Sequence, residues 1–207
     1  LGAFLLGVVA RLTFVHHSTF CINSVCHTFG RATYDIDSTA RDHWLVALIT
    51  GGEGYHNFHH RFASDYRNGV RWYQWDPGKW TIALLSWIGL ARRLHRVSPQ
   101  IILTARAAAE RQRVERALAR HPPSPGLAST LAAVRERYDA LRDAVYAWER
   151  AEKAYRGLRR ATVQASRAYV EEFKRECVRQ RRAAASARRR WVACINANPL
   201  IPRAAHV

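Results

Sequence analysis

The stretch from Gly51 to Tyr66, GGEGYHNFHHRFASDY, carries three histidines in an H-x-x-H-H pattern and decides how the rest of the sequence is interpreted. His56, His59 and His60 are spaced i, i+3 and i+4, so one helical turn would place all three imidazoles on a single face. Clustered imidazoles without a nearby pair of thiolates suit iron, copper or zinc and disfavour a structural zinc site. The pattern therefore predicts a short metal-binding helix, with a cluster of surface histidines as the alternative.

A second polar pair lies upstream, within an otherwise apolar segment. Asn23 and His27 are four residues apart, which places an amide and an imidazole on the same face of a helix. Because such groups are costly in apolar surroundings, we expect them to face other helices, a cofactor or the interface. His27 would join the H-x-x-H-H histidines only if the fold brings the two segments together, which their spacing leaves open.

Further short motifs follow one another around these two segments. They are Asn23-Ser-x-x-His27-x-x-Gly30, Tyr34-Asp35, Thr39-Ala-Arg-Asp42, Gly52-Glu-Gly-Tyr-His-Asn-Phe-His-His60, Asp65-Tyr66-Arg67 and Asp76-Pro77-x-Lys79-Trp80. The series resembles the carboxyl-terminal part of the membrane-bound acyl-CoA Δ9 desaturases of the bacterial type. The resemblance covers about residues 1 to 105 and is dense and ordered along the chain.

The resemblance implies a di-iron centre. In this family the positions of His27, His56, His59 and His60 are iron ligands, and Asn23 matches an asparagine that contacts the metal through water. Such a centre uses O₂ to remove two hydrogens from neighbouring methylenes of a fatty acyl-CoA chain, which yields a cis double bond and water. The expected function is therefore that of a fatty acyl-CoA desaturase.

The resemblance also implies a substrate tunnel and an electron donor. Thr19 and Phe20 match positions that line the bend of the tunnel, where the second residue is usually Trp. The departure at Phe20 leaves the tunnel shape and the chain-length preference open. An electron donor of the ferredoxin or cytochrome type is implied, and a basic cytoplasmic face would suit docking of an acidic donor.

Two features indicate that this chain is the incomplete carboxyl-terminal part of a longer protein. The family places two further His boxes, H-x-x-x-x-H and H-x-x-H-H, upstream of the segment seen here, and the sequence contains neither. The chain also begins with Leu and contains no Met. We therefore expect that residues 1 to 207 alone do not assemble an active centre.

The expected fold class is all-α, and its first part, residues 1–30, is predicted to be a truncated last transmembrane helix. About 25 mostly apolar residues can cross a hydrocarbon layer about 30 Å thick; a buried helix of a soluble protein is the alternative. Five arginines follow this segment and place the downstream chain in the cytoplasm by the positive-inside rule. They are Arg31, Arg41, Arg61, Arg67 and Arg71. The parent would be a multi-pass protein of the bacterial inner membrane.

Residues 31–105 are predicted to form a cytoplasmic domain that carries the His box. A helix is expected from about Ala40 to Thr50, capped by Ser38 or Thr39. Its expected buried side consists of Trp44, Leu45, Leu48 and Ile49. A second, amphipathic helix is expected from Lys79 to Leu94, of the kind that lies at a lipid interface; its apolar residues are Trp80, Leu84, Trp87 and Ile88.

Residues 106–207 are predicted to form a basic helical extension. A helix from about Pro99 to Arg120 is followed by a Pro-rich break, and apolar residues then recur at heptad spacing. These are Leu131, Val134, Tyr138, Leu141, Val145, Trp148 and Tyr155. An antiparallel helical hairpin is the simplest arrangement, used for packing or for homo-oligomers. The basic run Arg181 to Arg190 is either a solvated helix face or a contact with acidic lipid headgroups.

The net charge of +17 admits an anionic partner but does not identify one. Only three of the 33 basic residues are lysines, which leaves 30 arginines, a bias that a GC-rich genome also produces. No nucleic-acid-binding motif accompanies the charge, so no nucleic-acid partner is expected. Two other functions stay open: a related di-iron hydroxylase of the same membrane superfamily, and a non-enzymatic basic coiled-coil membrane adaptor.

Overall fold

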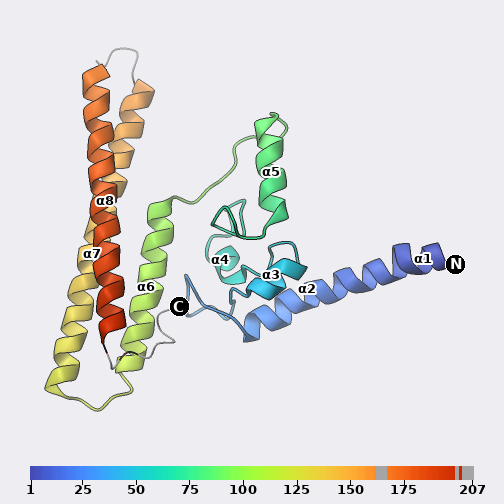
Figure 1. The fold of residues 1–207 in the computed structure, drawn as a ribbon, viewed down its shortest axis with the longest axis horizontal. Coiled ribbons are helices and arrows are strands. Elements are labelled where there is room, and N and C mark those ends of the chain that lie inside the picture. Colours follow the sequence, from blue (N-terminus) through green and yellow to red (C-terminus); the bar gives the residue numbers. More distant parts are fainter. Residues whose placement is uncertain (162–166, 199–200, 202–207) are drawn as a thin grey trace. The chain divides into compact units, whose positions relative to one another are not determined.

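The computed structural model describes residues 1–161, 167–198 and 201 (Figure 1). Helices and loops make up this part of the chain, with two isolated β-bridges and no strand, which confirms the all-α prediction. The chain divides into two compact units, Leu1–Val97 and Ser98–Val207. The sequence placed the division between the His-box domain and the extension at residues 105 and 106.

The first unit begins with one continuous helix made of α1 (Gly2–Phe4), the π-helical η1 (Leu5–Ala10) and α2 (Arg11–Thr28). Among the described residues this is the one helix that is long and apolar enough to cross a membrane. Four of its hydroxyl groups donate hydrogen bonds to the carbonyl four residues earlier, which satisfies them within the helix. The pairs are Thr13–Val9, Thr19–Val15, Ser24–Phe20 and Thr28–Ser24.

Helix α3 (Trp44–Ile49) is shorter than predicted and buries a different face. It is capped by His43, whose Nδ1 accepts a hydrogen bond from the Val46 amide at 3.3 Å, so the cap predicted at Ser38 or Thr39 is wrong. The predicted buried face is also wrong, because Val46 and Ala47 are buried instead. Residues Trp44, Leu45, Leu48 and Ile49 are all exposed.

The reason for this difference is the close approach of a glycine turn. The Gly54 backbone lies so near α3 that an added Cβ would come within 2.1 Å of the Ala47 nitrogen. Only the small Val46–Ala47 side of α3 fits against this turn, and the bulky residues face outward.

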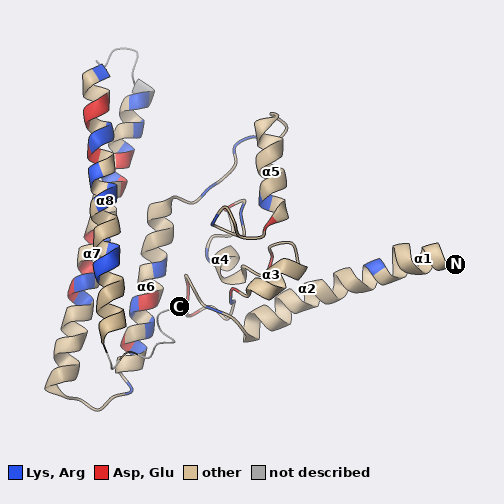
Figure 2. Cartoon of the chain, in the orientation of Figure 1, with Lys and Arg blue, Asp and Glu red and all other residues tan. Residues whose placement is uncertain are grey.

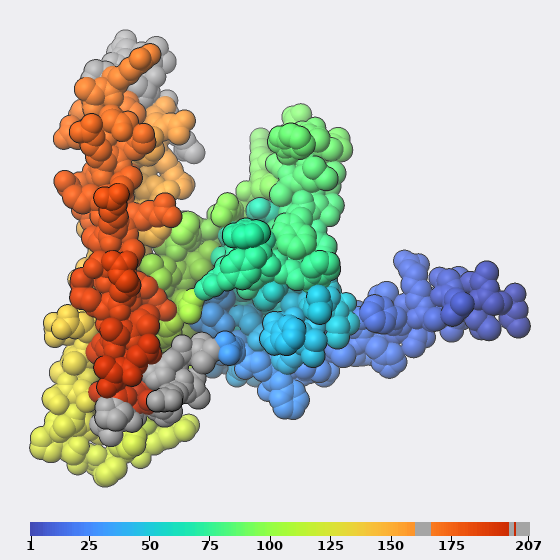
Figure 3. Space-filling view, in the orientation of Figure 1, coloured from blue at the N-terminus to red at the C-terminus, as the bar shows by residue number. Residues whose placement is uncertain are grey.

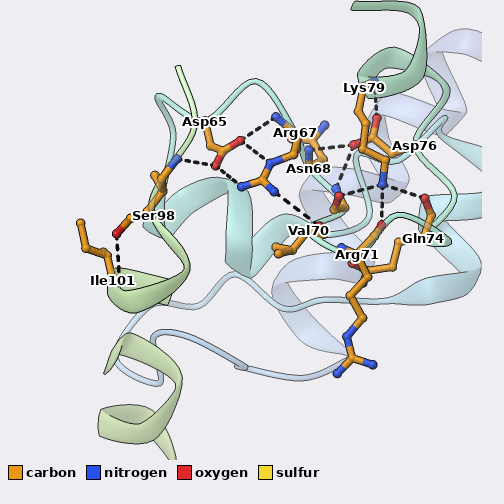
Figure 4. Close-up of polar contacts among 12 residues, drawn as sticks. Asp65, Arg67, Asn68, Val70, Arg71, Gln74, Asp76, Lys79, Ser98 and Ile101 are labelled. Carbon is orange, nitrogen blue, oxygen red and sulfur yellow. Dashed lines mark hydrogen bonds and ion pairs between the residues drawn. The ribbon is translucent and has the colours of Figure 1, made fainter. Parts of the chain in front are cut away.

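Helix α5 (Pro77–Trp87) lies after a loop that is held by buried charged groups (Figure 4). The Lys79 ammonium donates to the carbonyls of Gly69, Arg71 and Gln74 at 2.8, 2.8 and 3.0 Å. Burial lowers the pKa of Lys79, while the charge of Asp76 opposes that shift. The helix ends before the predicted Leu94 because Gly89 adopts a left-handed φ of +81°. Its predicted apolar residues Trp80, Leu84, Trp87 and Ile88 are exposed.

The second unit contains α6 (Pro99–Leu118), α7 (Pro125–Ala161) and α8 (Arg167–Ala197). Figure 1 shows α7 and α8 as a long antiparallel pair with α6 beside it. The heptad residues Val134, Tyr138, Leu141 and Val145 are buried, as expected of a helical seam. They pack with Ala184, Ala187, Trp191 and Ile195 of α8 and with Val114 and Leu118 of α6. The seam is therefore filled within the chain.

One carboxylate lies inside this apolar core. Glu110 of α6 accepts a hydrogen bond from Arg188 Nη2 at 2.6 Å and another from Trp191 Nε1 at 2.8 Å, and Arg106 pairs with it at 3.1 Å. Burial alone would raise the pKa of Glu110, but the hydrogen bonds and charge of Arg188 outweigh it, and the pKa is lowered. Glu110 thus ties α6 to α8.

We expect Glu110→Ala to lower the free energy of unfolding of the second unit by about 3 kcal/mol, because it leaves Arg188 partly buried without its partner. Asp139→Ala is the matched control. Asp139 pairs with Arg142 on the exposed face of α7, and its loss should cost less than about 1 kcal/mol. Chemical denaturation followed by helical circular dichroism measures both. Equal losses would contradict a structural role for the buried carboxylate.

Candidate metal centre

Three histidines from two separate segments converge in the first unit. His27 lies in the last turn of α2, and His56 and His60 belong to α4 (His56–Arg61). The Nε2 atom of His56 lies 3.1 Å from that of His27 and 3.0 Å from that of His60. One ligand atom from each of the three residues lies within 4.8 Å of the others. The fold therefore joins the upstream His27 to the H-x-x-H-H segment.

The distances from His56 Nε2 to the other two nitrogens fit ligands of a single metal ion. With metal–nitrogen bonds of about 2.0–2.1 Å, adjacent ligand nitrogens lie about 3.0–3.4 Å apart in octahedral or tetrahedral geometry. An all-imidazole donor set suits iron, copper or zinc. Nδ1 of the buried His56 has no hydrogen-bond partner among the described residues, so no outer contact of the kind that orients a metal-bound imidazole is formed at this residue.

His59, the remaining histidine of the motif, lies outside this cluster. Its ring is stacked on that of His56 with 6.2 Å between centroids, and it is 6.0 Å from the His60 ring. The position of His59 in the H-x-x-H-H pattern therefore does not bring it to the three converging nitrogens. A role as a ligand requires a second metal position.

The other predicted site residues lie on the exposed surface of α2. The Asn23 amide donates to the Thr19 carbonyl at 3.3 Å. The Thr19 hydroxyl donates to the Val15 carbonyl at 3.0 Å, and the Phe20 side chain is 64% exposed. The tunnel role of Thr19 and Phe20 and the water-mediated role of Asn23 stay predictions.

Two polar residues hold helix α4 in place: Asp42, which contacts it from an upstream segment, and Asn57, which belongs to α4 itself. Asp42 Oδ1 accepts hydrogen bonds from the backbone amides of Asn57 and Phe58 at 2.9 and 3.1 Å. These amides lie in the first turn of α4, where a helix provides no backbone carbonyl to accept their hydrogen bonds. The N-cap residue Tyr55 makes no side-chain hydrogen bond to them either. Asp42 therefore performs the N-capping function from fifteen residues upstream.

Asn57 makes the reverse connection, from α4 to the loop that follows α2. It is fully buried, and its Oδ1 accepts from the amides of Tyr34 and Asp35 at 2.7 and 3.2 Å. Its Nδ2 donates to the carbonyls of Asp35 and Ala40 at 2.8 and 2.9 Å. Every hydrogen-bonding position of this amide is used, so the loop and α4 have one fixed arrangement.

Thr39 contacts the far nitrogen of one candidate ligand. Its Oγ1 lies 2.8 Å from Nδ1 of His27. A partner at this nitrogen fixes the ring orientation and favours the tautomer with a free lone pair on Nε2. Sequence reasoning treated Thr39 only as a helix cap and gave Asp42 and Asn57 no role, because their contacts depend on tertiary packing. In the sequence, the only indication of a role for Thr39, Asp42 and Asn57 is that they belong to the motifs shared with the desaturases.

The electrostatics of the cluster keep its central imidazole neutral. Burial lowers the pKa of His56 to about 4, and the neighbouring charges of His60, His27 and His59 add to this effect. The pKa of His60 is lowered for the same reasons. A neutral imidazole retains the lone pair that a metal ligand needs, so His56 is ready to bind a cation at neutral pH.

Known proteins similar to this chain are desaturases, although no protein-family profile matches it. A probable acyl-CoA desaturase of Schizosaccharomyces pombe is 50% identical over 94 residues, which are 45% of this chain and 20% of that protein. Acyl-CoA desaturase 1 of Saccharomyces cerevisiae is 41% identical over 116 residues, 56% of this chain and 23% of that protein. The sn-2 palmitoyl-lipid 9-desaturase of Nostoc is 39% identical over 94 residues, 45% of this chain and 33% of that protein.

Desaturases of fungi, cyanobacteria and plants are thus homologues of part of this chain, and they support its assignment to the fatty acid desaturases. The comparison does not single out the bacterial Δ9 type. The chain spans only about a fifth to a third of the length of these relatives, so their full activity does not transfer to it directly.

We expect Asp42→Ala to destabilise α4 by about 1–2 kcal/mol, because two first-turn amides lose their acceptor. Asp42→Asn keeps an acceptor oxygen of the same reach and should cost clearly less. Hydrogen exchange at the α4 amides, compared among wild type and the two variants, measures the difference. If Ala and Asn have the same effect, the side-chain cap is not what holds the helix.

The metal-free first unit should lose stability as the pH falls from 6.5 to about 4. In this range the unfolded chain protonates His56 before the folded chain does, so unfolding is favoured by about 3 kcal/mol at the acid end. His56→Phe should remove the His56 part of this loss and leave the part from His60, whose pKa is also lowered. Exchange at the α4 amides, corrected for intrinsic rates, gives the difference between the two proteins. Burial raises the pKa of Asp42 to about 6, so Asp42 also changes the stability in this pH range. Because Asp42 is present in both proteins, its contribution is removed when the two are compared.

Proposed function

We propose that this chain supplies part of an iron centre for the desaturation of fatty acyl chains. The observation that carries the proposal is the convergence of three histidines in a chain whose homologues are desaturases: His56 Nε2 lies 3.1 Å from His27 Nε2 and 3.0 Å from His60 Nε2, and all three ligand atoms lie within 4.8 Å of one another. The motif resemblance also implies these three residues as ligands, together with His59. The geometry and the resemblance therefore agree on His27, His56 and His60.

The two irons of the proposed centre divide the histidines between them. His27, His56 and His60 would hold one iron through their Nε2 atoms. His59, about 6 Å away from the rings of His56 and His60, binds the second iron. The remaining ligands come from His boxes elsewhere in a longer protein, so the 207 residues alone are inactive.

The bound iron would supply the activation of O₂, which amino-acid side chains alone do not provide. The side chains of this chain hold and orient it. Thr39 fixes the His27 ring, Asp42 and Asn57 fix α4, and the Asn23 amide orients a water between itself and the metal. Thr19 and Phe20 would line the path of the acyl chain.

The substrate is a fatty acyl-CoA, and the parent is a multi-pass protein of the bacterial inner membrane. Helix α2 crosses the bilayer and the exposed aromatic residues of α5 lie at the interface. The arginines that follow α2 keep the metal centre on the cytoplasmic side. There it receives electrons from a donor of the ferredoxin or cytochrome type.

Titration of the detergent-solubilised chain with Co²⁺ tests the three-histidine site. We expect one tightly bound equivalent, with an affinity reduced at least about 100-fold by His56→Ala, which removes the central ligand. His59→Ala is the matched control and should leave this equivalent unchanged, because His59 lies outside the cluster. Visible absorption of the bound cobalt reports both. A chain that binds no Co²⁺, or loses it equally in both variants, contradicts the assignment.

Activity is tested in the longer protein that contains the upstream coding sequence. Expression in a host without desaturase should yield unsaturated acyl chains, lost on His56→Ala. Hydroxylated products would instead identify the related hydroxylase. Unchanged lipids together with normal metal binding would show that the centre serves neither reaction.

A further inference from the structure

The outer face of α8 carries an arginine stripe, defined here as Arg175, Arg182 and Arg189. These residues are seven apart, so they lie on one side of the helix, and all three are exposed. The buried side of α8 is the opposite one, formed by Ala184, Ala187, Trp191 and Ile195. Figure 2 shows basic residues along α8, and Figure 3 shows one side of this helix uncovered by α6 and α7.

The charge of this face is not neutralised within the described part of the chain. From Cys177 to Ala197, the part of α8 that contains Arg182 and Arg189, the sequence has six arginines and no acidic residue, whereas Glu171, Glu172 and Glu176 lie near Arg175 in sequence. Of these six, Arg188 points inward and pairs with Glu110, and Arg179 pairs with Glu176. The stripe residues have no ion-pair partner among the described residues, unlike Arg142 and Arg156 of α7, which pair with Asp139 and Glu152.

The spacing of the stripe favours an extended anionic partner over a small anion. Successive stripe residues are about 10 Å apart along the axis, and the whole stripe spans about 21 Å. Three charges at this spacing do not converge on one phosphate. They match a surface on which negative charges repeat, because each arginine then meets its own anionic group.

We propose that the arginine stripe binds the anionic headgroups of the bilayer in which the chain is anchored. The candidate membrane helix Gly2–Thr28 belongs to the same chain, so the second unit meets that surface at high effective concentration. Nucleic acid is disfavoured because the residues between the arginines on this face are Val178, Ser186 and Ala193, with no aromatic side chain for base stacking. The inference rests on the membrane location in the proposed function, not on the metal centre.

Arginine-specific dicarbonyl labelling of the full chain in lipid nanodiscs tests this contact residue by residue. One set of nanodiscs contains only phosphatidylcholine, and the other contains 30% phosphatidylglycerol, about one anionic lipid in three. We expect labelling of Arg175, Arg182 and Arg189 to slow at least about fivefold in the anionic discs, and to recover in 0.5 M salt because screening weakens the contact. Arg156, exposed on α7, and the half-buried Arg142 of the same helix are the internal controls, and each should label at the same rate in both kinds of disc.

Equal labelling ratios at the stripe and at the control arginines would overturn the proposal. Protection of the stripe by added RNA or DNA, but not by anionic lipid, would also overturn it and identify nucleic acid as the partner. Co²⁺ binding on the same sample separates this test from the proposed function. His56→Ala should abolish the cobalt spectrum and leave the labelling pattern of α8 unchanged.

Discussion

The first unit depends on the polar network that connects α4 with the loop after α2. Asp42 accepts the two free amides of the first turn of α4, and Asn57 returns four hydrogen bonds to residues 34–40. Leaving such buried groups unpaired costs about 1–3 kcal/mol each, so alternative placements of α4 are strongly disfavoured. The loop follows directly on His27, and the network therefore brings α2 and α4 together. The meeting of three imidazoles is a consequence of this arrangement.

The sequence predicted the type of each element better than its packing. The heptad seam of α7 was recognisable because Val134, Tyr138, Leu141 and Val145 repeat regularly, and these residues are buried. The buried face of α3 was not recognisable. Its large apolar residues resemble a core, yet the close contact with Gly54 admits only Val46 and Ala47. A contact between segments that are distant in sequence leaves no periodic signal.

The candidate site shows the same limit. The H-x-x-H-H spacing identified His56, His59 and His60, and the family resemblance added His27. Spacing alone placed all three motif histidines on one face, whereas a six-residue helix brings only two of them to the His27 nitrogen. Thr39 and Asp42 were visible as motif members, but their roles required the fold. The second unit has its own apolar core, and its outer charge points to a task distinct from catalysis.

X-ray absorption spectroscopy of the cobalt-loaded chain tests the central claim most directly. If His27, His56 and His60 bind one ion through Nε2, the spectrum will show three imidazole nitrogens at about 2.1 Å with their characteristic multiple scattering. His27→Ala should then reduce the number of imidazoles to two. A spectrum with at most one imidazole, or one that His27→Ala leaves unchanged, would contradict the account.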